Sequence, residues 1–245
     1  MIEMHGIRAL EECGCNAWPA RQTVFCNGWA LRLSGGHTKR ANSANALAPE
    51  GAFSDVRAAA EALYARHGQP AIFRLTPLAP DEADRTLEAA GYRFVDPSIV
   101  MTAPLDDDGP IDGVAINAVP TPEWCAGFAA ASDVAPDVRE VHDRMLASIA
   151  LPAAFATIAE DGAPAGYGIA VTERGRTGLF DIVVVDAARG RGLGRKLTGA
   201  LLHWGRSQGA GSAYLQVQGD NAVARSLYER LGFTEAYRYH YRIGM

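Results

Sequence analysis

The sequence lacks long apolar runs. Nothing in its 245 residues approaches the roughly 18 consecutive apolar residues of a membrane span. We therefore expect no membrane association. Near the N-terminus, Glu3, Glu11 and Glu12 interrupt any apolar segment, so no secretory signal peptide is predicted. The corresponding expectation is a cytoplasmic protein.

Cysteine is scarce: the chain has only Cys13, Cys15, Cys26 and Cys125. Their spacing matches neither a zinc-binding pattern nor a disulfide framework. We expect reduced thiols and no metal site. A redox or metal-binding pair at Cys13 and Cys15 stays open as an alternative.

An excess of positive charge is also missing, because the formal net charge is -5. Nucleic-acid binders present a basic face, so this balance argues against a nucleic-acid partner. The content of 48% hydrophobic and 21% charged residues is typical of a soluble globular protein. The length suits one large domain or two small ones.

One segment, 106–113, reads DDDGPIDG and has almost nothing to bury. Its acidic residues, glycines and proline are typical of a linker. It separates a first half, 1–105, from a second half, 114–245.

Both halves alternate strand and helix patterns, which predicts an α/β fold with a mixed sheet and helices on both faces. Before the linker, the predicted strands are 29–34, 71–75 and 92–102, and the predicted helices are 55–67 and 81–90. After it, the predicted strands are 114–119, 153–159, 165–172, 179–185, 213–217 and 233–241. The predicted helices there are 122–131, 138–149, 192–207 and 221–231. The run 179–185 is strongly apolar and β-branched, so we expect a central strand.

A weak internal repeat relates 71–102 to 213–242. Each runs strand, short helix, glycine-aromatic, strand, and LEAAGY at 87–92 lies over YERLGF at 228–233. Chance similarity between two βαβ units is the alternative.

The chemistry concentrates in 181–195, which reads DIVVVDAARGRGLGR. A buried strand leads into a glycine-rich loop, and an amphipathic helix starts inside that loop. Backbone N–H groups at a helix N-terminus favour an anion, and glycines let a ligand approach the backbone. With four basic side chains nearby, the segment suits a pyrophosphate.

Three other interpretations of this loop compete with a pyrophosphate site. A Rossmann site needs GxGxxG with an acidic residue about 20 positions on, whereas the glycines here run GxGxG. A P-loop needs GxxxxGK[ST], which is absent. An ordinary strand-helix turn with a solvated basic helix face remains open.

Two motifs together resemble the GNAT superfamily of N-acetyltransferases. Arg189-x-x-Gly192-x-Gly194 matches its Q/R-x-x-G-x-G/A signature, and Asn221-x6-Tyr228-x3-Gly232-Phe233 matches its next motif at the usual distance. The resemblance covers about 114–245 and is strongest over 179–233. It implies a complete GNAT domain in 114–245, preceded by a partial, degenerate GNAT-like half. Locally it is closest to enzymes that acetylate protein N-terminal amines.

The resemblance also implies roles for single residues. In such enzymes the strand before the loop contacts the pantetheine arm of acetyl-CoA, the loop amides hold the pyrophosphate, and an Asn contacts the cofactor. The implied cofactor-binding residues are Ile182, Val183, Val184, Arg189, Gly190, Arg191, Gly192, Leu193, Gly194, Arg195 and Asn221. Tyr228 is implied to protonate the leaving thiolate.

Structural roles compete with these assignments. Tyr228 would also suit a core position on the helix face of Val223, Leu227 and Leu231. Asn221 would suit a helix cap, which is compatible with a cofactor contact. Arg189 would suit a solvated surface position.

The general base departs from the family pattern. Where relatives place a carboxylate, this sequence has Gln216, which cannot accept a proton, and Phe180. Asp181 is the nearest acid on the central strand, so it is our predicted base, although strand alternation points it away from the substrate. Weaker options are Glu173, His142, His203 and a water chain.

The predicted function is acetyl transfer from acetyl-CoA to a primary amine, of a small molecule or a protein, by direct attack in a ternary complex. An alternative of another class is a non-catalytic acyl-CoA-binding sensor, which the missing base would allow. A longer acyl group is a third option. In the first half, 35–43 reads GGHTKRANS. It resembles a segment ahead of some GNAT domains and also a phosphate-binding turn, but no helix follows it directly.

Overall fold

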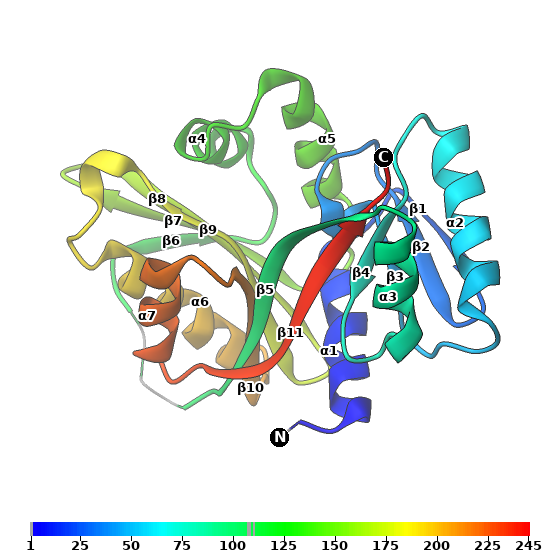
Figure 1. Cartoon of the computed structure of the whole chain (residues 1–245). Helices are drawn as coiled ribbons and strands as arrows, with labels where there is room; N and C mark the ends of the chain where they lie inside the picture. The colour runs from blue at the N-terminus through cyan, green and yellow to red at the C-terminus, as the bar shows by residue number, and fades with distance from the viewer. Residues whose placement is uncertain (1, 107–108, 110) are drawn as a thin grey trace. The chain divides into compact units, whose positions relative to one another are not determined.

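The computed structural model describes residues 2–106, 109 and 111–245 (Figure 1). The chain forms two compact units. Unit 1 comprises Met1–Val100, Gln218–Asp220 and Glu235–Met245, and unit 2 comprises Met101–Val217 and Asn221–Thr234. This division differs from the predicted 1–105 and 114–245 because the C-terminal strand belongs to unit 1. Of the predicted linker 106–113, positions 107, 108 and 110 lie outside the described residues.

Unit 1 is a mixed sheet with three α-helices among its described residues. The strand order is β1-β2-β3-β4-β11-β5. Only β3 and β4 are paired in parallel among the pairs described here; β1 with β2, β2 with β3, and β4 with β11 are antiparallel. The elements are α1 (Met4–Ala17), β1 (Gln22–Cys26), β2 (Trp29–Leu33), a short 3-10 turn (Lys39–Ala41), β3 (Ala44–Ala46), α2 (Phe53–Arg66), β4 (Ile72–Leu75), α3 (Asp81–Ala89), β5 (Arg93–Pro104) and β11 (Thr234–Ile243).

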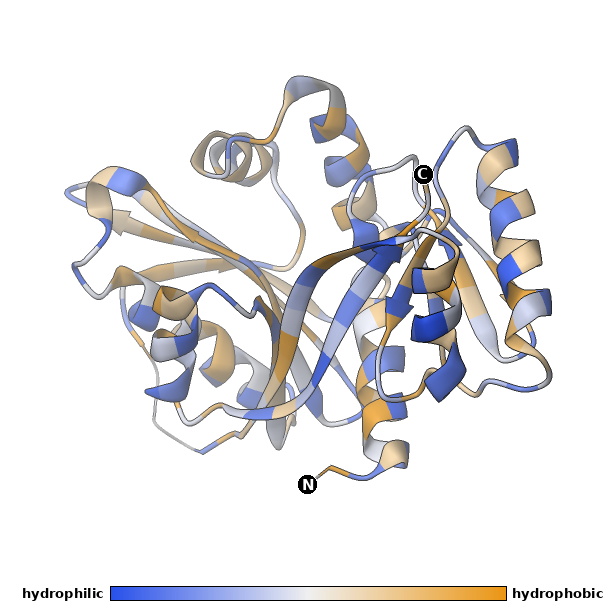
Figure 2. Ribbon diagram, in the orientation of Figure 1, coloured by the Kyte–Doolittle hydropathy of each residue, from blue (hydrophilic) through white to orange (hydrophobic). Residues whose placement is uncertain are grey.

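An aromatic cluster fills the core of unit 1. Phe73 of β4 lies edge-on to Trp29 and Phe53, with ring centroids 6.1 and 5.6 Å away. Helix α2 buries Val56, Ala60 and Tyr64, spaced four apart, so one face of the helix covers this core. In Figure 2, α2 and α3 accordingly carry hydrophilic turns between hydrophobic ones.

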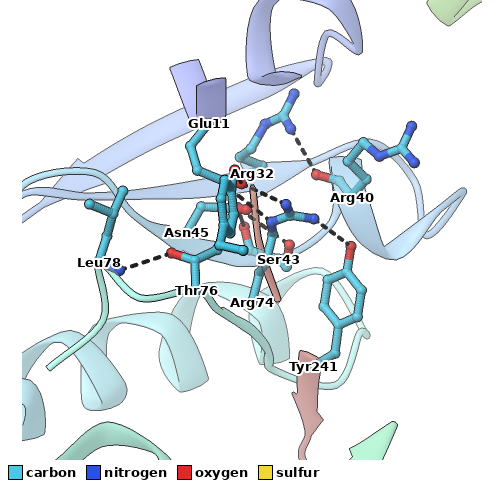
Figure 3. Close-up of polar contacts among 10 residues, drawn as sticks. Glu11, Arg32, Arg40, Ser43, Asn45, Arg74, Thr76, Leu78 and Tyr241 are labelled. Carbon is cyan, nitrogen blue, oxygen red and sulfur yellow. Dashed lines mark hydrogen bonds and ion pairs between the residues drawn. The ribbon is translucent and has the colours of Figure 1, made fainter. Parts of the chain in front are cut away.

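A buried ion pair links three elements of unit 1. Glu11 of α1 accepts two hydrogen bonds from the Arg74 guanidinium of β4, at 2.7 and 2.9 Å. The hydroxyl of Tyr237 on β11 donates to the same carboxylate at 2.5 Å. Figure 3 shows Arg74 reaching Glu11 on one side and Tyr241 on the other. A charge pair taken out of water is tolerated only with such complete hydrogen bonding.

Tyrosines of β11 surround the Arg74 guanidinium. Its carbon lies 3.5 Å from the ring centroid of Tyr239, a close cation–π contact. Burial acts to lower the pKa of Arg74, but Glu11 and the tyrosines raise it well above its ordinary value, so the guanidinium stays charged. These contacts, with the pairing of His240–Ile243 against Leu75–Ile72, hold the last strand in unit 1.

Unit 2 has the strand order β10-β9-β8-β7-β6, in which β10 and β9 are parallel and the other pairs are antiparallel. Its elements are β6 (Val114–Asn117), α4 (Pro122–Ala131), α5 (Pro136–Ala147), β7 (Ala153–Glu160), β8 (Ala163–Glu173), β9 (Arg176–Val184), a 3-10 turn (Asp186–Ala188), α6 (Leu193–Ser207), β10 (Ser212–Gln218) and α7 (Ala222–Glu229).

Helices lie on both faces of this sheet, α4 and α5 on one side and α6 on the other (Figure 1). Neighbouring residues of β8 show why, because successive side chains point to opposite faces. Tyr167 packs against Gly127 of α4, whereas Gly168 lies under Leu197 and Leu201 of α6. Strands β7 to β9 are therefore covered on both faces, which explains their hydrophobic colouring in Figure 2.

The helices α3 and α7, which the predicted repeat aligns, end in the same way. Helix α3 ends with Gly91 at φ 81°, and the Tyr92 N–H bonds the Leu87 carbonyl at 3.0 Å. Helix α7 ends in the same way: Gly232 has φ 83°, and the Phe233 N–H bonds the Tyr228 carbonyl at 3.0 Å. Both ends need a left-handed residue, which glycine supplies. Leu87 is thus the structural counterpart of Tyr228.

One α-helix and two strands of unit 1, namely α1, β1 and β3, were not predicted from the sequence, and neither was the 3-10 turn. Cys13 and Cys15 lie on α1, and all four cysteines are free thiols. Burial raises the pKa of the Cys15 thiol, which keeps it unreactive. The described residues contain no group of three or more metal-capable side chains and no helix with the length and hydropathy of a membrane span.

The Glu11–Arg74 pair yields a stability prediction. Glu11→Leu leaves a buried guanidinium without its counter-ion, so we expect the free energy of unfolding to fall by about 3–5 kcal/mol. The double variant Glu11→Leu/Arg74→Met removes both charges and should recover most of that loss. Urea unfolding followed by circular dichroism measures both. A single variant within 1 kcal/mol of wild type, or a double variant no more stable than the single, would contradict this role.

Candidate active site

Strands β9 and β10 of unit 2 separate part of the way along their length. They pair in parallel from Arg176 with Ser212 to Leu179 with Leu215, and among the described residues the pairing ends there. Both strands continue, β9 to Val184 and β10 to Gln218. Past Leu179, the edge of β9 that faced β10 has backbone groups that need another partner, such as a ligand.

A β-bulge in β9 lies where the strands separate. Tyr167 of β8 pairs with Val183, and Ile169 pairs with Phe180. Two residues, Asp181 and Ile182, therefore stand opposite Gly168 alone. Asp181 has φ 50°, a left-handed conformation that Asp tolerates better than most side chains. Bulges bend a strand and increase its twist, which accounts physically for the parting of β9 from β10.

The loop after β9 presents bare backbone at the start of α6. Gly190 and Gly192 have φ 79° and 80°, and a Cβ built on either would meet no atom within 4 Å. Gly192 is the N-cap of α6, and no side chain caps this helix end. The first N–H groups of α6 consequently face open space, an arrangement that binds anions.

These features line one pocket of about 740 Å³, between β9, the loop, α6 and α7. All the predicted cofactor-binding residues except Arg191 line it, and so does Tyr228. The lining residues are Ile182, Val183, Val184, Ala188, Arg189, Gly190, Gly192, Leu193, Gly194, Arg195, Asn221, Val223, Ala224, Leu227, Tyr228 and Arg230.

The loop arginines lie in different directions. Arg191 forms an ion pair with Glu160 of β7 at 3.0 Å, which directs it away from the pocket. Arg189 lines the pocket, and its guanidinium is held by Asp186 at 2.7 Å and by the Val184 carbonyl. Both are exposed, so these contacts are weak restraints that a phosphate group would displace.

Helix α7 supplies the opposite wall. The Asn221 side chain accepts a hydrogen bond from the Ala224 N–H at 3.0 Å and so caps the helix while lining the pocket. Tyr228 is buried, with its ring edge-on to Phe233 at 5.9 Å. Burial raises the pKa of Tyr228 to about 12, so its hydroxyl keeps its proton at neutral pH.

Sequence reasoning did not single out three further lining residues of α7, namely Val223, Ala224 and Leu227, nor Arg230 just after it. It considered Val223 for the core, yet Val223 is 83% exposed. The apolar face of an amphipathic helix can line a ligand pocket as well as a core. Periodicity alone therefore assigns a residue such as Val223 to the core when it lies at a pocket wall.

Asp181 lies beside a buried histidine. Its Oδ2 is 2.9 Å from Nε2 of His142 on α5. Asp181 does not line the 740 Å³ pocket. Of the other predicted candidates for the base, Glu173 pairs with Arg174 at 3.2 Å, and His203 lines a cavity with Arg195 and Lys196. Phe180 is buried edge-on to Tyr214.

Comparisons with known proteins identify the family of this chain. The family described as "Probable histone acetyltransferase Rv0428c C-terminal" matches residues 5–242. An uncharacterised N-acetyltransferase, YobR of Bacillus subtilis (strain 168), is 29% identical over 98% of this chain and 99% of its own.

Solved structures share the fold at low identity. A GCN5-related N-acetyltransferase from Kribbella flavida has a TM-score of 0.69 and 18% identity, covering 97% of this chain and 95% of its own. A tandem GNAT protein from the clavulanic acid biosynthesis pathway has a TM-score of 0.64 and 17% identity, covering 96% and 87%. These likenesses confirm the predicted GNAT-type fold. Together with the match over 5–242, they show that the chain is an acetyltransferase of the GNAT superfamily, in the family described as "Probable histone acetyltransferase Rv0428c C-terminal".

Proposed function

We propose that this protein transfers an acetyl group from acetyl-CoA to a primary amine, of a small molecule or a protein, by direct attack in a ternary complex. The observation that carries the proposal is the pocket of about 740 Å³ that the separated edge of β9, the start of α6 and Tyr228 all line. A thioester needs such a combination: a slot for its arm, an anion site for its phosphates and a proton donor beside the leaving sulfur.

The residues of the pocket fit coenzyme A. The positive φ and open space at Gly190 and Gly192 leave room for a pyrophosphate against the α6 amides, and Arg189 and Arg195 add charge. The edge of β9 from Ile182 to Val184 would hold the pantetheine arm. When bound, acetyl-CoA supplies the activated acetyl group.

The protein's own contribution is to position groups and move protons. An amine acceptor is protonated at neutral pH and must lose a proton before it attacks. Asp181, the acidic residue of β9, lies outside the pocket but keeps 20% of its side-chain surface exposed, and we assign it the role of taking that proton. Tyr228, which keeps its proton at neutral pH because burial raises its pKa to about 12, donates that proton to the departing sulfur.

The first half offers no second site of this kind among its described residues. At the counterpart of Tyr228 it has Leu87, which has no hydroxyl. Its glycine-rich turn is filled by Asn42, whose Oδ1 accepts from the Ser34 and Gly36 N–H groups at 2.7 and 3.0 Å. Those amides are therefore unavailable to a phosphate. A non-catalytic acyl-CoA sensor is the alternative function, and turnover separates it from the enzyme.

We predict that acetyl-CoA binds with a stoichiometry near one and, at 100 times its dissociation constant, stabilises the fold by about 2.7 kcal/mol. Gly192→Asp should abolish binding because it places bulk and negative charge at the anion site. The matched control is Gly209→Asp beyond the other end of α6, where φ is 86° and a Cβ also meets no atom within 4 Å. Both variants carry similar backbone strain, which makes them a matched pair. The control should bind acetyl-CoA normally because Gly209 does not line the pocket.

Thermal shift and titration calorimetry measure these effects. Equal loss of binding in the two glycine variants would mean that strain, rather than the anion site, is responsible. No stabilisation of the wild type by millimolar acetyl-CoA would overturn the proposed cofactor.

Turnover is tested with acetyl-CoA and a panel of amines that includes lysine side chains and N-termini of peptides, with release of free thiol as the readout. We predict that Tyr228→Phe lowers kcat by roughly 10²–10⁴-fold, the range for a lost general acid, and leaves acetyl-CoA affinity unchanged. Tyr167→Phe removes a hydroxyl from another buried tyrosine of unit 2 and should retain full activity. Normal turnover by Tyr228→Phe would show that its hydroxyl has no part in the reaction.

A further inference from the structure

One buried polar contact in unit 2 is not explained by packing. His142 of α5 is only 2% exposed, yet its ring lies among the aromatic residues under the sheet. Phe128 of α4 stacks on it at 5.1 Å with an interplanar angle of 20°. An apolar residue of similar volume would suit this position, because burying an imidazole without a partner is unfavourable. The histidine therefore requires a specific reason to be there.

Its partner is the carboxylate of Asp181. The two side chains approach to 2.9 Å between Nε2 and Oδ2, a full hydrogen bond. Asp181 retains 20% of its side-chain surface, whereas His142 retains 3%. The carboxylate can thus be reached from outside, and the imidazole behind it cannot.

A second carboxylate lies on the other side of the imidazole. Oδ1 of Asp143 lies 3.6 Å from Nδ1 of His142, and Arg139 holds Asp143 at 3.5 Å. The thiol of Cys125 on α4 lies beside Asp143, and burial raises its pKa to about 11, so no further negative charge arises there at neutral pH. The ring is fixed by Phe128 and flanked by two carboxylates, which sets the direction of its Nε2 atom.

The β-bulge determines which way Asp181 points. In a regular strand, side chains alternate between the two faces of the sheet, so the direction of Asp181 would follow from that of its neighbours. The left-handed φ of 50° and the two-to-one pairing opposite Gly168 break that alternation. Backbone strain of this kind persists where the surroundings enforce it, often at functional sites.

We propose that His142 is the positioning residue for the catalytic base of this acetyltransferase, with Asp181 as that base. The inference rests on the proposed function. Nε2–H of His142 donates to Oδ2, which orients the carboxylate and leaves Oδ1 to take the proton from the acceptor. In that step, one N–H bond of the acceptor ammonium breaks and an O–H bond forms at Oδ1. The freed nitrogen lone pair then attacks the acetyl carbon as the bond from that carbon to sulfur breaks. The nitrogen loses a second proton to water, the leaving sulfur takes a proton from Tyr228, which regains one from water, and Asp181 returns its own proton to water.

The test is a double-mutant cycle in the full-length chain, with acetyl-CoA and the best amine from the panel. His142→Leu should lower kcat by about 10²-fold, the size of effect expected when a reacting group is misplaced by about 1 Å. Asp181→Asn removes the base, and Asn is chosen because it also tolerates the left-handed φ. In the Asp181→Asn background, His142→Leu should change kcat by less than about 3-fold, because residues that act as one unit are not additive.

A conservative variant separates positioning from packing. His142→Gln places a side-chain NH₂ group near the original Nε2, so it should recover kcat to within about 10-fold of wild type. Acetyl-CoA affinity and the thermal midpoint, measured for each variant, report on folding. If His142 had a purely structural role, His142→Leu would lower kcat by the same factor in both backgrounds, and His142→Gln would not restore kcat.

Two outcomes would overturn the proposal. One is equal loss of kcat from His142→Leu with and without Asp181, and the other is wild-type kcat in His142→Leu. Either result, with a wild type that acetylates amines, leaves the proposed function standing and removes His142 from it. A wild type that binds acetyl-CoA but acetylates no amine overturns the proposed function itself, and the inference with it.

Discussion

The separation of β9 from β10 beyond Leu179 and Leu215 is the constraint on which the site depends. Within a sheet, the backbone N–H and C=O groups bond to the neighbouring strand. A ligand can bond to these groups only where two strands have separated. In unit 2, the bulge at Asp181 and Ile182 opens it. The same irregularity provides the gap for a ligand and turns a carboxylate toward α5. One local departure from strand geometry therefore supports both halves of the proposed chemistry.

The two units bury charge in different ways. In unit 1, Glu11 and Arg74 are closed off by tyrosines and saturate each other's hydrogen-bonding groups. Such a pair can specify how α1, β4 and β11 come together, but no substrate can reach it. In unit 2, Asp181 shares only one contact of this kind and stays partly exposed. Accessibility, more than charge itself, distinguishes the carboxylate suited to proton transfer from the one suited to architecture.

Local signals allowed much of unit 2 and its pocket to be predicted from the sequence. The apolar run of β9, the glycines at 190, 192 and 194 and the cap at Asn221 are short-range features, and each lies where the pattern indicated. The helix α1 was missed because Glu3 gives it no side-chain cap and no acidic residue opens its first turn. Its buried residues recur at helical spacing, but start and stop signals were absent.

Long-range features were beyond sequence reasoning. His142 and Asp181 are 39 residues apart, and nothing in either segment indicates that a bulge brings them together. The assignment of β11 to unit 1 depends on its pairing with β4, more than 150 positions earlier, and on Arg74. A strand's own composition specifies its faces but leaves its neighbour open. The sequence pattern therefore predicted helices and strands but did not predict which of them pair or contact each other.

The path of the chain has a consequence for how this protein can be inherited and engineered. Neither unit is a continuous stretch, because unit 1 takes up Gln218–Asp220 and Glu235–Met245 after the chain has already built most of unit 2. A gene cut between the halves would separate β11 from β4 and strip unit 1 of the tyrosines around Arg74. During synthesis, unit 1 has an unfilled strand position until Thr234–Ile243 have been made. The two units therefore depend on one uninterrupted chain.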